Sequence, residues 1–257
     1  MKATRAQVFT DLKQWREERE SGHFASGRIG FVPTMGALHE GHRSLLRRAR
    51  AENELVVTSV FVNPTQFDNK DDLATYPRTL ESDVEFAGDL VDAVVAPNAA
   101  ALYADDYRYR VIETDLSRVM EGEQRPGHFD GVLTVVMKFL NLVRPERAYF
   151  GRKDWQQLQL VRGMAAAFFL PVEIVECETG RDPDGLAMSS RNRRLSSAAR
   201  ARAANFLRIL SSAANTDDAR RALAASGLVV DYVEERDGVR LGAVRLEGVR
   251  LIDNVRI

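Results

Sequence analysis

The chain has 257 residues, of which 36 are basic and 37 acidic, and its formal net charge is −1. This balance argues against a dedicated nucleic-acid binder, which normally carries a strong basic excess. A hydrophobic fraction of 45% is ordinary for a globular protein and supplies a full core. The lone Cys177 excludes an internal disulfide and a cysteine-based zinc site, and its apolar surroundings are typical of a buried strand. Because we see no leader-like segment and no apolar run of membrane-spanning length, we expect a cytoplasmic protein.

The first two-thirds of the chain alternate short apolar runs with amphipathic stretches. Strands are predicted at 28–33, 55–62, 93–96, 147–150 and 172–177, and helices at 41–52, 79–90, 132–143 and 154–168. The run at 55–62 is continuously apolar, as in a parallel strand that is covered on both faces. Strands that alternate with helices predict an α/β fold with a Rossmann-like, doubly wound parallel sheet.

The pattern changes near Thr179, where a loop rich in Arg, Asp, Pro, Gly and Ser begins. Helices are predicted at 197–214 and 217–225, and period-two strands at 228–234, 239–246 and 249–257. We therefore expect two domains, a Rossmann-like domain at 1–178 and a smaller C-terminal α+β domain at 179–257 that acts as a lid. The Ala- and Arg-rich helix is interpreted as a solvated surface helix rather than a polyanion site.

The sharpest motif follows the first of these predicted strands and leads into the helix after it. It reads Pro33-Thr34-Met35-Gly36-Ala37-Leu38-His39-Glu40-Gly41-His42. Gly36 and Gly41 allow a ligand to approach the backbone closely, and the helix N-terminus offers N–H groups to a phosphate. His39 and His42 are spaced so that both imidazoles can face one spot, where they would donate hydrogen bonds to phosphate oxygens and stabilise developing charge.

Two plainer interpretations of the histidine pair compete with this one. In the first, one histidine caps the helix and the other is a surface residue. In the second, the pair binds zinc, but no cysteine lies near and His23 and His128 are distant in sequence. The strand–glycine–histidine–helix context favours the phosphate site over both.

Two further segments carry side chains suited to a nucleotide. Met188-Ser189-Ser190-Arg191-Asn192 lies in the loop after the last strand of the large domain, where Gly180 and Gly185 favour a lid that closes on a triphosphate. Taken alone, such a string is a common turn. Lys153, in Phe150-Gly151-Arg152-Lys153-Asp154, is one of only five lysines beside 31 arginines, a choice explained by a compact ammonium beside phosphates. Asp154 has the alternative role of a helix cap.

All three segments lie at or after the ends of predicted strands. Ligands of open α/β sheets bind in the crevice beyond the carboxyl ends of the strands. We interpret the set as a site that activates ATP at its α-phosphate.

In these and further motifs the chain resembles the pantothenate synthetase family. That family belongs to the nucleotidyltransferase superfamily, which shares a His-x-Gly-His signature with class I aminoacyl-tRNA synthetases. The resemblance rests on blocks that occur in the family order over nearly the whole chain: 33–42, 60–67, 76–79, 125–129, 151–157, 188–192 and 251–254. It implies ATP-dependent condensation of pantoate with β-alanine through a pantoyl-adenylate, with Mg²⁺ as cofactor and a homodimer as the assembly.

The family's functional residues are carried over position by position. The catalytic residues would be His42, the family's proton donor, and its partner His39, together with Lys153, Ser189, Ser190 and Arg191. The ATP site would comprise Met35, Gly36, Ala37, Leu38, His39, Glu40, Gly41, His42, Gly151, Arg152, Lys153, Asp154, Gly180, Met188, Ser189, Ser190 and Arg191. Pantoate and β-alanine would meet Gln66, Gln157, Pro33, Met35, Arg125 and His128. Asp83 would lie near Mg²⁺.

The sequence departs from the family pattern in two places. Arg152 stands where many relatives have Glu, and the C-terminal domain is short for the family. Two other functions compete with this one: another adenylate-forming or nucleotidyl-transferring enzyme, and a non-catalytic nucleotide-binding module. Gln66 and Gln157 argue against the first, because their neutral amides suit a small hydroxy acid as the substrate. The retained His39, His42 and Lys153 argue against the second.

Overall fold

The computed structural model describes residues 6–257, which divide into two compact units. The first comprises residues 6–151 and Gln156–Cys177, and the second comprises Arg152–Trp155 and Glu178–Ile257. Within the described residues no helix is long and apolar enough to cross a membrane.

The first unit is built on a six-stranded sheet in which every pair of neighbouring strands is parallel. The strands are β1 (Gln7–Phe9), β2 (Ile29–Thr34), β3 (Leu55–Val60), β4 (Ala93–Val95), β5 (Arg147–Gly151) and β6 (Glu173–Cys177). The spatial order is β1-β4-β3-β2-β5-β6. The chain thus builds outward from β2 on one side and returns to β5 on the other, which places the topological switch point between β2 and β5.

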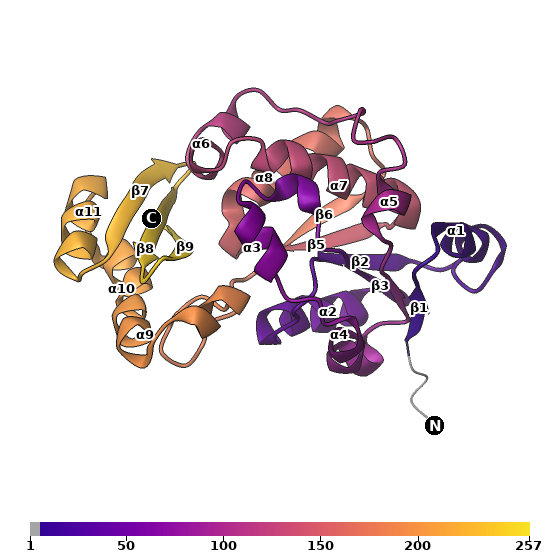
Figure 1. Cartoon of the computed structure of the whole chain (residues 1–257), viewed down its shortest axis with the longest axis horizontal. Helices are drawn as coiled ribbons and strands as arrows, with labels where there is room; N and C mark the ends of the chain where they lie inside the picture. The colour runs from indigo at the N-terminus through magenta and orange to yellow at the C-terminus, as the bar shows by residue number, and fades with distance from the viewer. Residues whose placement is uncertain (1–5) are drawn as a thin grey trace. The chain divides into compact units, whose positions relative to one another are not determined.

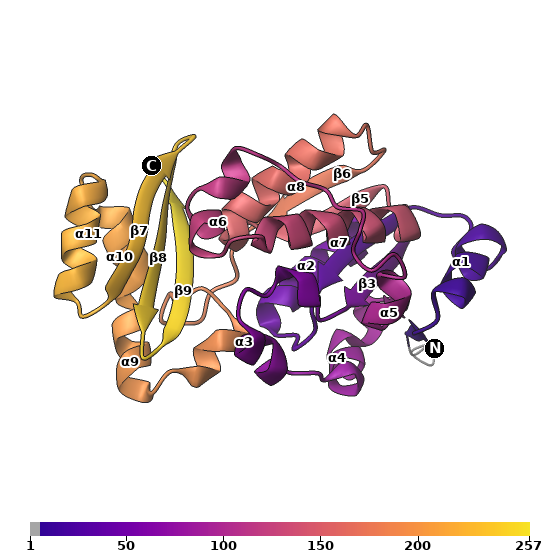
Figure 2. The same ribbon diagram turned by 45° about the horizontal axis from the view of Figure 1, so that its top comes forward.

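Helices cover both faces of this sheet, as Figures 1 and 2 show. The helices at residues 12–167 are α1 (Leu12–Ser21), α2 (Glu40–Glu52), α3 (Lys70–Thr75), α4 (Leu80–Ala87), α5 (Ala99–Leu102), α6 (Glu121–Gln124), α7 (His128–Val143) and α8 (Trp155–Ala167). Short 3₁₀ turns are η1 (Pro64–Gln66), η2 (Gly88–Leu90) and η3 (Leu116–Arg118). The predicted parallel, doubly wound fold is confirmed.

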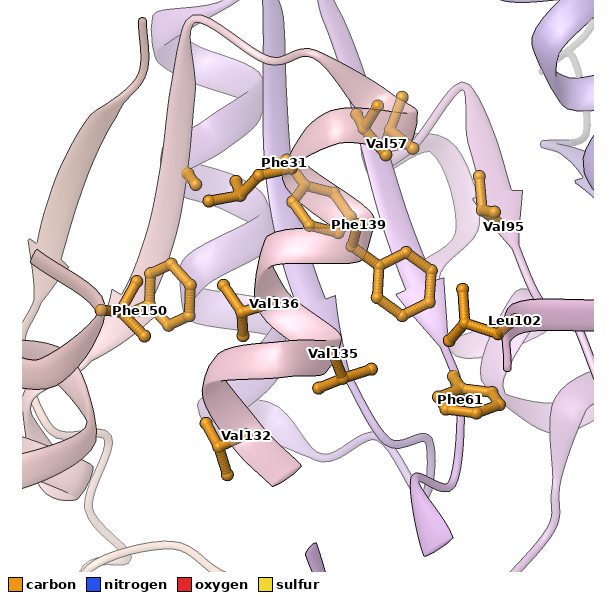
Figure 3. Close-up of a cluster of buried hydrophobic side chains, with 14 of the residues drawn as sticks. Phe31, Val57, Phe61, Val95, Leu102, Val132, Val135, Val136, Phe139 and Phe150 are labelled. Atoms are coloured by element: carbon orange, nitrogen blue, oxygen red, sulfur yellow. The ribbon is translucent and has the colours of Figure 1, made fainter. Parts of the chain in front are cut away.

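Alternation along the strands explains why both faces need helices. Phe31 and Val57 belong to the core beneath α7, whereas Val32 and Val56 belong to the core beneath α2 and α4. Figure 3 shows Val132, Val135, Val136 and Phe139 of α7 gathered with Phe31, Val57 and Phe61. Each such fully buried side chain contributes about 1.5–3 kcal/mol through removal of apolar surface from water.

The second unit contains an antiparallel sheet in the order β7-β8-β9, packed against helices. Its elements are η4 (Arg152–Asp154), η5 (Ser190–Arg194), α9 (Ser197–Ala203), α10 (Asn205–Ser212), α11 (Thr216–Ala225), β7 (Val229–Arg236), β8 (Val239–Leu246) and β9 (Val249–Arg256). A Cβ at Gly242 of β8 would lie 3.1 Å from Phe206 and Leu210 of α10, so glycine there permits close helix–sheet packing.

Three local predictions differ from the structure. The single helix expected at 197–214 is interrupted at Ala204, although its buried stripe of Ala199, Ala203, Phe206 and Leu210 continues across the break at helical spacing. Helix α7 begins at His128 rather than at 132. The third difference is that no strand or helix was predicted where β1 and α1 form, because their short apolar runs are flanked by many charged residues.

Candidate active site

The motif 33–42 forms the end of β2, a tight loop and the first turn of α2. Thr34 fixes the end of the strand, because its hydroxyl donates to Ser59 O at 2.6 Å and accepts from Gly36 N at 3.2 Å. Gly36 and Ala37 both have positive φ, of 84° and 51°. A Cβ on Gly36 would lie 2.8 Å from an oxygen of Asp83, so only glycine fits this turn.

Asp83 of α4 holds the loop between β2 and α2 through its carboxylate. Its carboxylate accepts hydrogen bonds from Ala37 N at 3.1 Å, Leu38 N at 2.7 Å and the Thr79 hydroxyl at 3.1 Å, and only 3% of the residue is exposed. Asp83, the residue predicted to lie near Mg²⁺, therefore holds the loop in place through these three hydrogen bonds. Across residues 6–257 no group of three or more His, Cys, Asp and Glu side chains is placed to hold a metal ion.

His39 and His42 form a reciprocal cap on α2. Gly41 N donates to His39 Nδ1 at 3.2 Å, and His39 N donates to His42 Nδ1 at 3.3 Å. Because each Nδ1 accepts a hydrogen bond from a backbone N–H group, each neutral ring must carry its proton on Nε2. The ring centroids are 4.1 Å apart. The capping role and the phosphate role weighed as alternatives in the sequence are thus compatible in one pair.

This arrangement changes which groups of the loop can serve a ligand. The backbone N–H groups of Ala37, Leu38, His39 and Gly41 all donate to side chains of the protein itself. From the sequence, both the N–H groups of the helix N-terminus beyond Gly41 and the two imidazoles were expected to face a phosphate. Hydrogen bonds within the protein account for four of the nearby N–H groups, and the phosphate-binding role of the imidazoles stays a prediction.

Gln66 lies at the end of η1 with 9% of its surface exposed. Its Oε1 accepts from Asn63 Nδ2 at 3.0 Å, and its Nε2 lies 3.1 Å from the sulfur of Met35. Its backbone oxygen accepts from His128 Nδ1 at 2.8 Å and from the Arg125 guanidinium at 3.2 Å. The structure therefore brings Met35, Gln66, Arg125 and His128 into contact, and their role in binding pantoate and β-alanine stays a prediction.

A buried network behind Gln66 escaped the sequence analysis. Asn63 Oδ1 accepts from the Tyr103 hydroxyl at 2.7 Å and from the Thr65 hydroxyl at 2.9 Å. Burial raises the pKa of Tyr103 to about 12. Gly131 lets α7 approach η1, because a Cβ there would lie 2.4 Å from Thr65 O. Asn63 lies in the block 60–67, one of the segments that resemble the family, so the sequence could have identified it as a site residue. No local sequence pattern indicates a role for Tyr103 or Gly131.

Two neighbouring glutamines at the start of α8 differ sharply. Gln156 is 3% exposed and uses its whole amide structurally, accepting from Glu121 N at 3.0 Å and donating to Leu116 O and Val119 O at 2.7 and 2.8 Å. Gln157 is half-buried, and its side chain makes no hydrogen bond with any described residue. Of these two glutamines, Gln157 is therefore the one whose amide remains to bind a substrate.

Gly151 ends the first stretch of the first unit, and the predicted residues at 152–154 and 180–191 belong to the second unit. Lys153 lies in η4, with 21% of its side chain exposed and its ammonium 3.8 Å from Asp154. The Arg152 guanidinium makes a bidentate pair with Glu178. Arg152 is thus committed to a carboxylate of its own unit, which gives the departure from Glu at this position a structural role.

The segment before Ser189 is an ordered hairpin. Arg181 and Ala187 form an antiparallel bridge, Met188 N donates to Gly180 O at 2.9 Å, and Gly185 makes the turn with a φ of 86°. Ser189 then caps η5 by accepting from Arg191 N at 3.3 Å. The hairpin places Ser190 and Arg191 in the first turn of η5.

Comparison with known proteins identifies the family to which the chain belongs. The model of the family described as "Pantoate-beta-alanine ligase" matches residues 7–256. The chain is 47% identical to a pantothenate synthetase of Bdellovibrio bacteriovorus, with 96% of this chain and 97% of the relative covered. It is 49% identical to a pantothenate synthetase of Coxiella burnetii, with 96% of each covered.

Solved structures agree. A pantoate-β-alanine ligase from Francisella tularensis, crystallised with β,γ-ATP and β-alanine, superposes with a TM-score of 0.91 at 37% identity, covering 98% of this chain and 97% of that one. A pantothenate synthetase from Thermus thermophilus superposes with a TM-score of 0.88 at 38% identity, covering 97% and 99%. Although the C-terminal domain looked short for the family, the chain spans nearly the full length of these relatives.

Proposed function

The chain belongs to the pantoate–β-alanine ligase family, and from that premise we propose how its residues carry out the reaction. The enzyme makes pantothenate from pantoate and β-alanine, with ATP as a substrate. In the first step the pantoate carboxylate attacks the α-phosphorus of ATP, the bond to pyrophosphate breaks, and pantoyl-adenylate forms. In the second step the amine of β-alanine attacks the acyl carbon, loses a proton and displaces AMP.

The histidine pair is the observation that supports this site most strongly. The cap on α2 occupies Nδ1 of both rings, so Nε2 carries the proton of each neutral ring. Two such donors, fixed before ATP arrives, would stabilise the charge that builds on the phosphate oxygens as pyrophosphate leaves. His42 acts as the main donor and His39 as its partner.

Gln66 and Gln157 would hold pantoate. Because Asn63 already donates to the Gln66 oxygen, Gln66 presents its N–H₂ group, which suits a carboxylate or hydroxyl oxygen. Gln157 brings an amide that the protein does not use. Arg125 and His128 support Gln66 from its backbone side, while Pro33 and Met35 provide apolar surface, and Gln66 also borders the β-alanine site.

A further set of residues would bind the nucleotide. Lys153 would contact the phosphates, with Gly151 to Asp154 and Gly180 approaching through their backbone. Ser189, Ser190 and Arg191 would supply two hydroxyls and a guanidinium, groups that form strong hydrogen bonds with phosphate. The division into a domain at 1–178 and a lid at 179–257 belongs to this proposal.

Among the described residues, no group of three or more His, Cys, Asp and Glu side chains is placed to hold magnesium by itself. Both oxygens of Asp83 accept hydrogen bonds from the loop and Thr79. We assign no step to a protein-bound metal. Mg²⁺ commonly enters such enzymes on substrate phosphates, with most of its shell made of water.

The assembly and the location of the enzyme are also proposals. We propose a homodimer through the first unit, where Tyr109 and Ile112 are 78% and 54% exposed on one irregular segment. Analytical ultracentrifugation tests this, and a monomer at micromolar concentration would contradict it. We propose that the enzyme works in the cytoplasm and that it has no nucleic-acid partner, in keeping with the formal charge of −1.

Rapid mixing of the enzyme with ATP and pantoate tests the proposed function. Without β-alanine we expect one equivalent of pyrophosphate and an enzyme-bound adenylate, and addition of β-alanine should then release AMP. His42→Ala should fold normally and lose this burst by about 10²–10³-fold, the usual effect of removing one transition-state donor. Pyrophosphate release that requires β-alanine, with no trapped adenylate, would contradict the two-step mechanism.

A further inference from the structure

Strand β9 carries two adjacent polar residues, Asp253 and Asn254, that the proposed reaction does not use. They belong to the block 251–254, yet neither was assigned a role. Both are almost completely buried, with 3% and 4% of their surface exposed. Neighbouring side chains of a strand point to opposite faces, so the two residues serve different neighbours.

Asn254 holds the turn that carries Lys153. Its Nδ2 donates to Arg152 O and to Lys153 O, each at 2.9 Å. The amide has two N–H bonds and both are used on consecutive carbonyls of η4. A carboxylate in this place would have no hydrogen to donate and would repel both oxygens.

Asp253 holds the hairpin that leads to Ser189. Its oxygens accept from the Arg181 guanidinium at 2.7 and 2.9 Å, a bidentate pair in which the Asp253 side chain is 1% exposed. Arg181 also donates to Gly185 O at 3.1 Å, across the turn of the hairpin. Asp253 in addition accepts from Asn254 N at 2.8 Å, which stiffens the strand at the point where the two side chains diverge.

We propose that Asp253 and Asn254 are positioning residues for the adenylation step. One short stretch of β9 fixes the Lys153 turn through Asn254 and the segment at 188–191 through Asp253 and Arg181. The inference rests on the proposed roles of Lys153 and Arg191 at the ATP phosphates. Buried, fully satisfied polar contacts of this kind hold a functional group in one geometry, and small misplacements of a reacting group cost up to about 10²-fold in rate.

Kinetics of single variants give the first test. Asn254→Ala and Asp253→Asn should lower the rate of pyrophosphate release from ATP and pantoate by about ten- to a hundredfold. KM for ATP should rise while KM for pantoate changes little. Asp231→Asn is the matched control: Asp231 also accepts from two arginines in the same sheet, Arg245 and Arg250, at 2.7–3.1 Å, but touches neither segment. It should lose a similar amount of stability and keep its kinetics.

Double-mutant cycles separate positioning from general destabilisation. Asn254→Ala should cause little further loss in a Lys153→Ala background, yet add fully to Arg191→Ala. Asp253→Asn should show the opposite pattern. Additive effects in all four combinations, or normal kinetics of folded Asn254→Ala and Asp253→Asn, would overturn the inference. If Lys153→Ala and Arg191→Ala themselves leave adenylation unchanged, the proposed nucleotide site fails instead.

Discussion

The histidine pair shows how one residue can serve structure and chemistry through different atoms. Nδ1 of His39 caps α2, whereas Nε2 faces the other way. Helix capping by a side-chain acceptor is worth about 1 kcal/mol. Since the cap also fixes which nitrogen carries the proton, the two functions are linked in the same ring.

His39→Asn should separate these functions. The asparagine Oδ1 replaces Nδ1 as an acceptor for Gly41 N, so the variant should unfold at nearly the wild-type temperature. It lacks the Nε2–H donor, so adenylate formation should fall by about 10²-fold or more. His39→Ala should lose the same activity and about 1 kcal/mol of stability as well. Equal activity of His39→Asn and wild type in a pyrophosphate assay would contradict the donor role.

Gln156 and Gln157 offer a matched pair of substitutions. Gln157→Ala removes an amide that the protein does not use, so thermal stability should be unchanged while KM for pantoate rises more than KM for ATP. Gln156→Ala leaves Glu121 N and Leu116 O without these partners and removes one of the two donors to Val119 O, which keeps Gly122 N, so it should destabilise the fold by a few kcal/mol, at about 1–3 kcal/mol for each lost partner. Steady-state kinetics and urea unfolding check both. A larger rise in KM for ATP would reject the pocket assignment of Gln157.

At the scale of the element, the end of α8 combines correct hydrogen bonding with an unfavourable residue. Leu170 N bonds to Ala165 O and Phe169 N bonds to Ala166 O, the two bonds of a Schellman motif. The residue between helix and strand, Phe169, must then take a positive φ of 54°. Glycine is preferred at this position because it has no Cβ to clash.

Phe169→Gly should therefore stabilise the protein by about 0.5–1 kcal/mol. The side chain of Phe169 is 91% exposed, so little packing is lost. Ala166→Gly, inside the same last turn with ordinary helical geometry, should destabilise by about 1 kcal/mol and controls for general effects of glycine. The free energy of unfolding in urea is the measurement, and a loss of stability in Phe169→Gly would show that its side chain has a packing partner.

Helix α7 links the core to the site. Its inner face fills the core beneath the sheet, while its first turn brings His128 and Gly131 against η1. The periodic apolar pattern revealed the helix but not its true beginning, because residues 128–131 are held by contacts with η1 rather than by hydrophobic spacing.

At the scale of the whole molecule, two buried tyrosines set the behaviour at high pH. Burial raises the pKa of Tyr103 and of Tyr149 to about 12, from an ordinary value of 10.0. For an acid whose pKa is higher in the folded state, the folded form favours the protonated group. The resulting stability is fully present below about pH 10 and is lost as the pH rises toward 12.

We expect the free energy of unfolding to fall between pH 10 and pH 12, with tyrosinate absorbance rising over the same range. Tyr103→Phe and Tyr149→Phe should each flatten this dependence, although each also loses hydrogen bonds, to Asn63 and to Glu52 respectively. The pH slope of stability, rather than its absolute value, is therefore the measurement. A slope in the double variant equal to that of the wild type would contradict the assignment.

The α/β fold and the family follow from the sequence alone, which also predicted the site residues position by position. Strand and helix periods are local properties, and motifs such as 33–42 and 60–67 keep their chemistry in contiguous residues. The hydrogen-bond partners of Asp83, Gln66, Asp253 and Asn254 could be identified only from the folded chain. Those assignments depend on hydrogen bonds between residues far apart in the sequence, such as Asp83 with Leu38, 45 positions away, and Asn254 with Lys153, 101 positions away. Such bonds exist only after packing has removed water from both partners, and no local pattern encodes which buried donor will meet which acceptor.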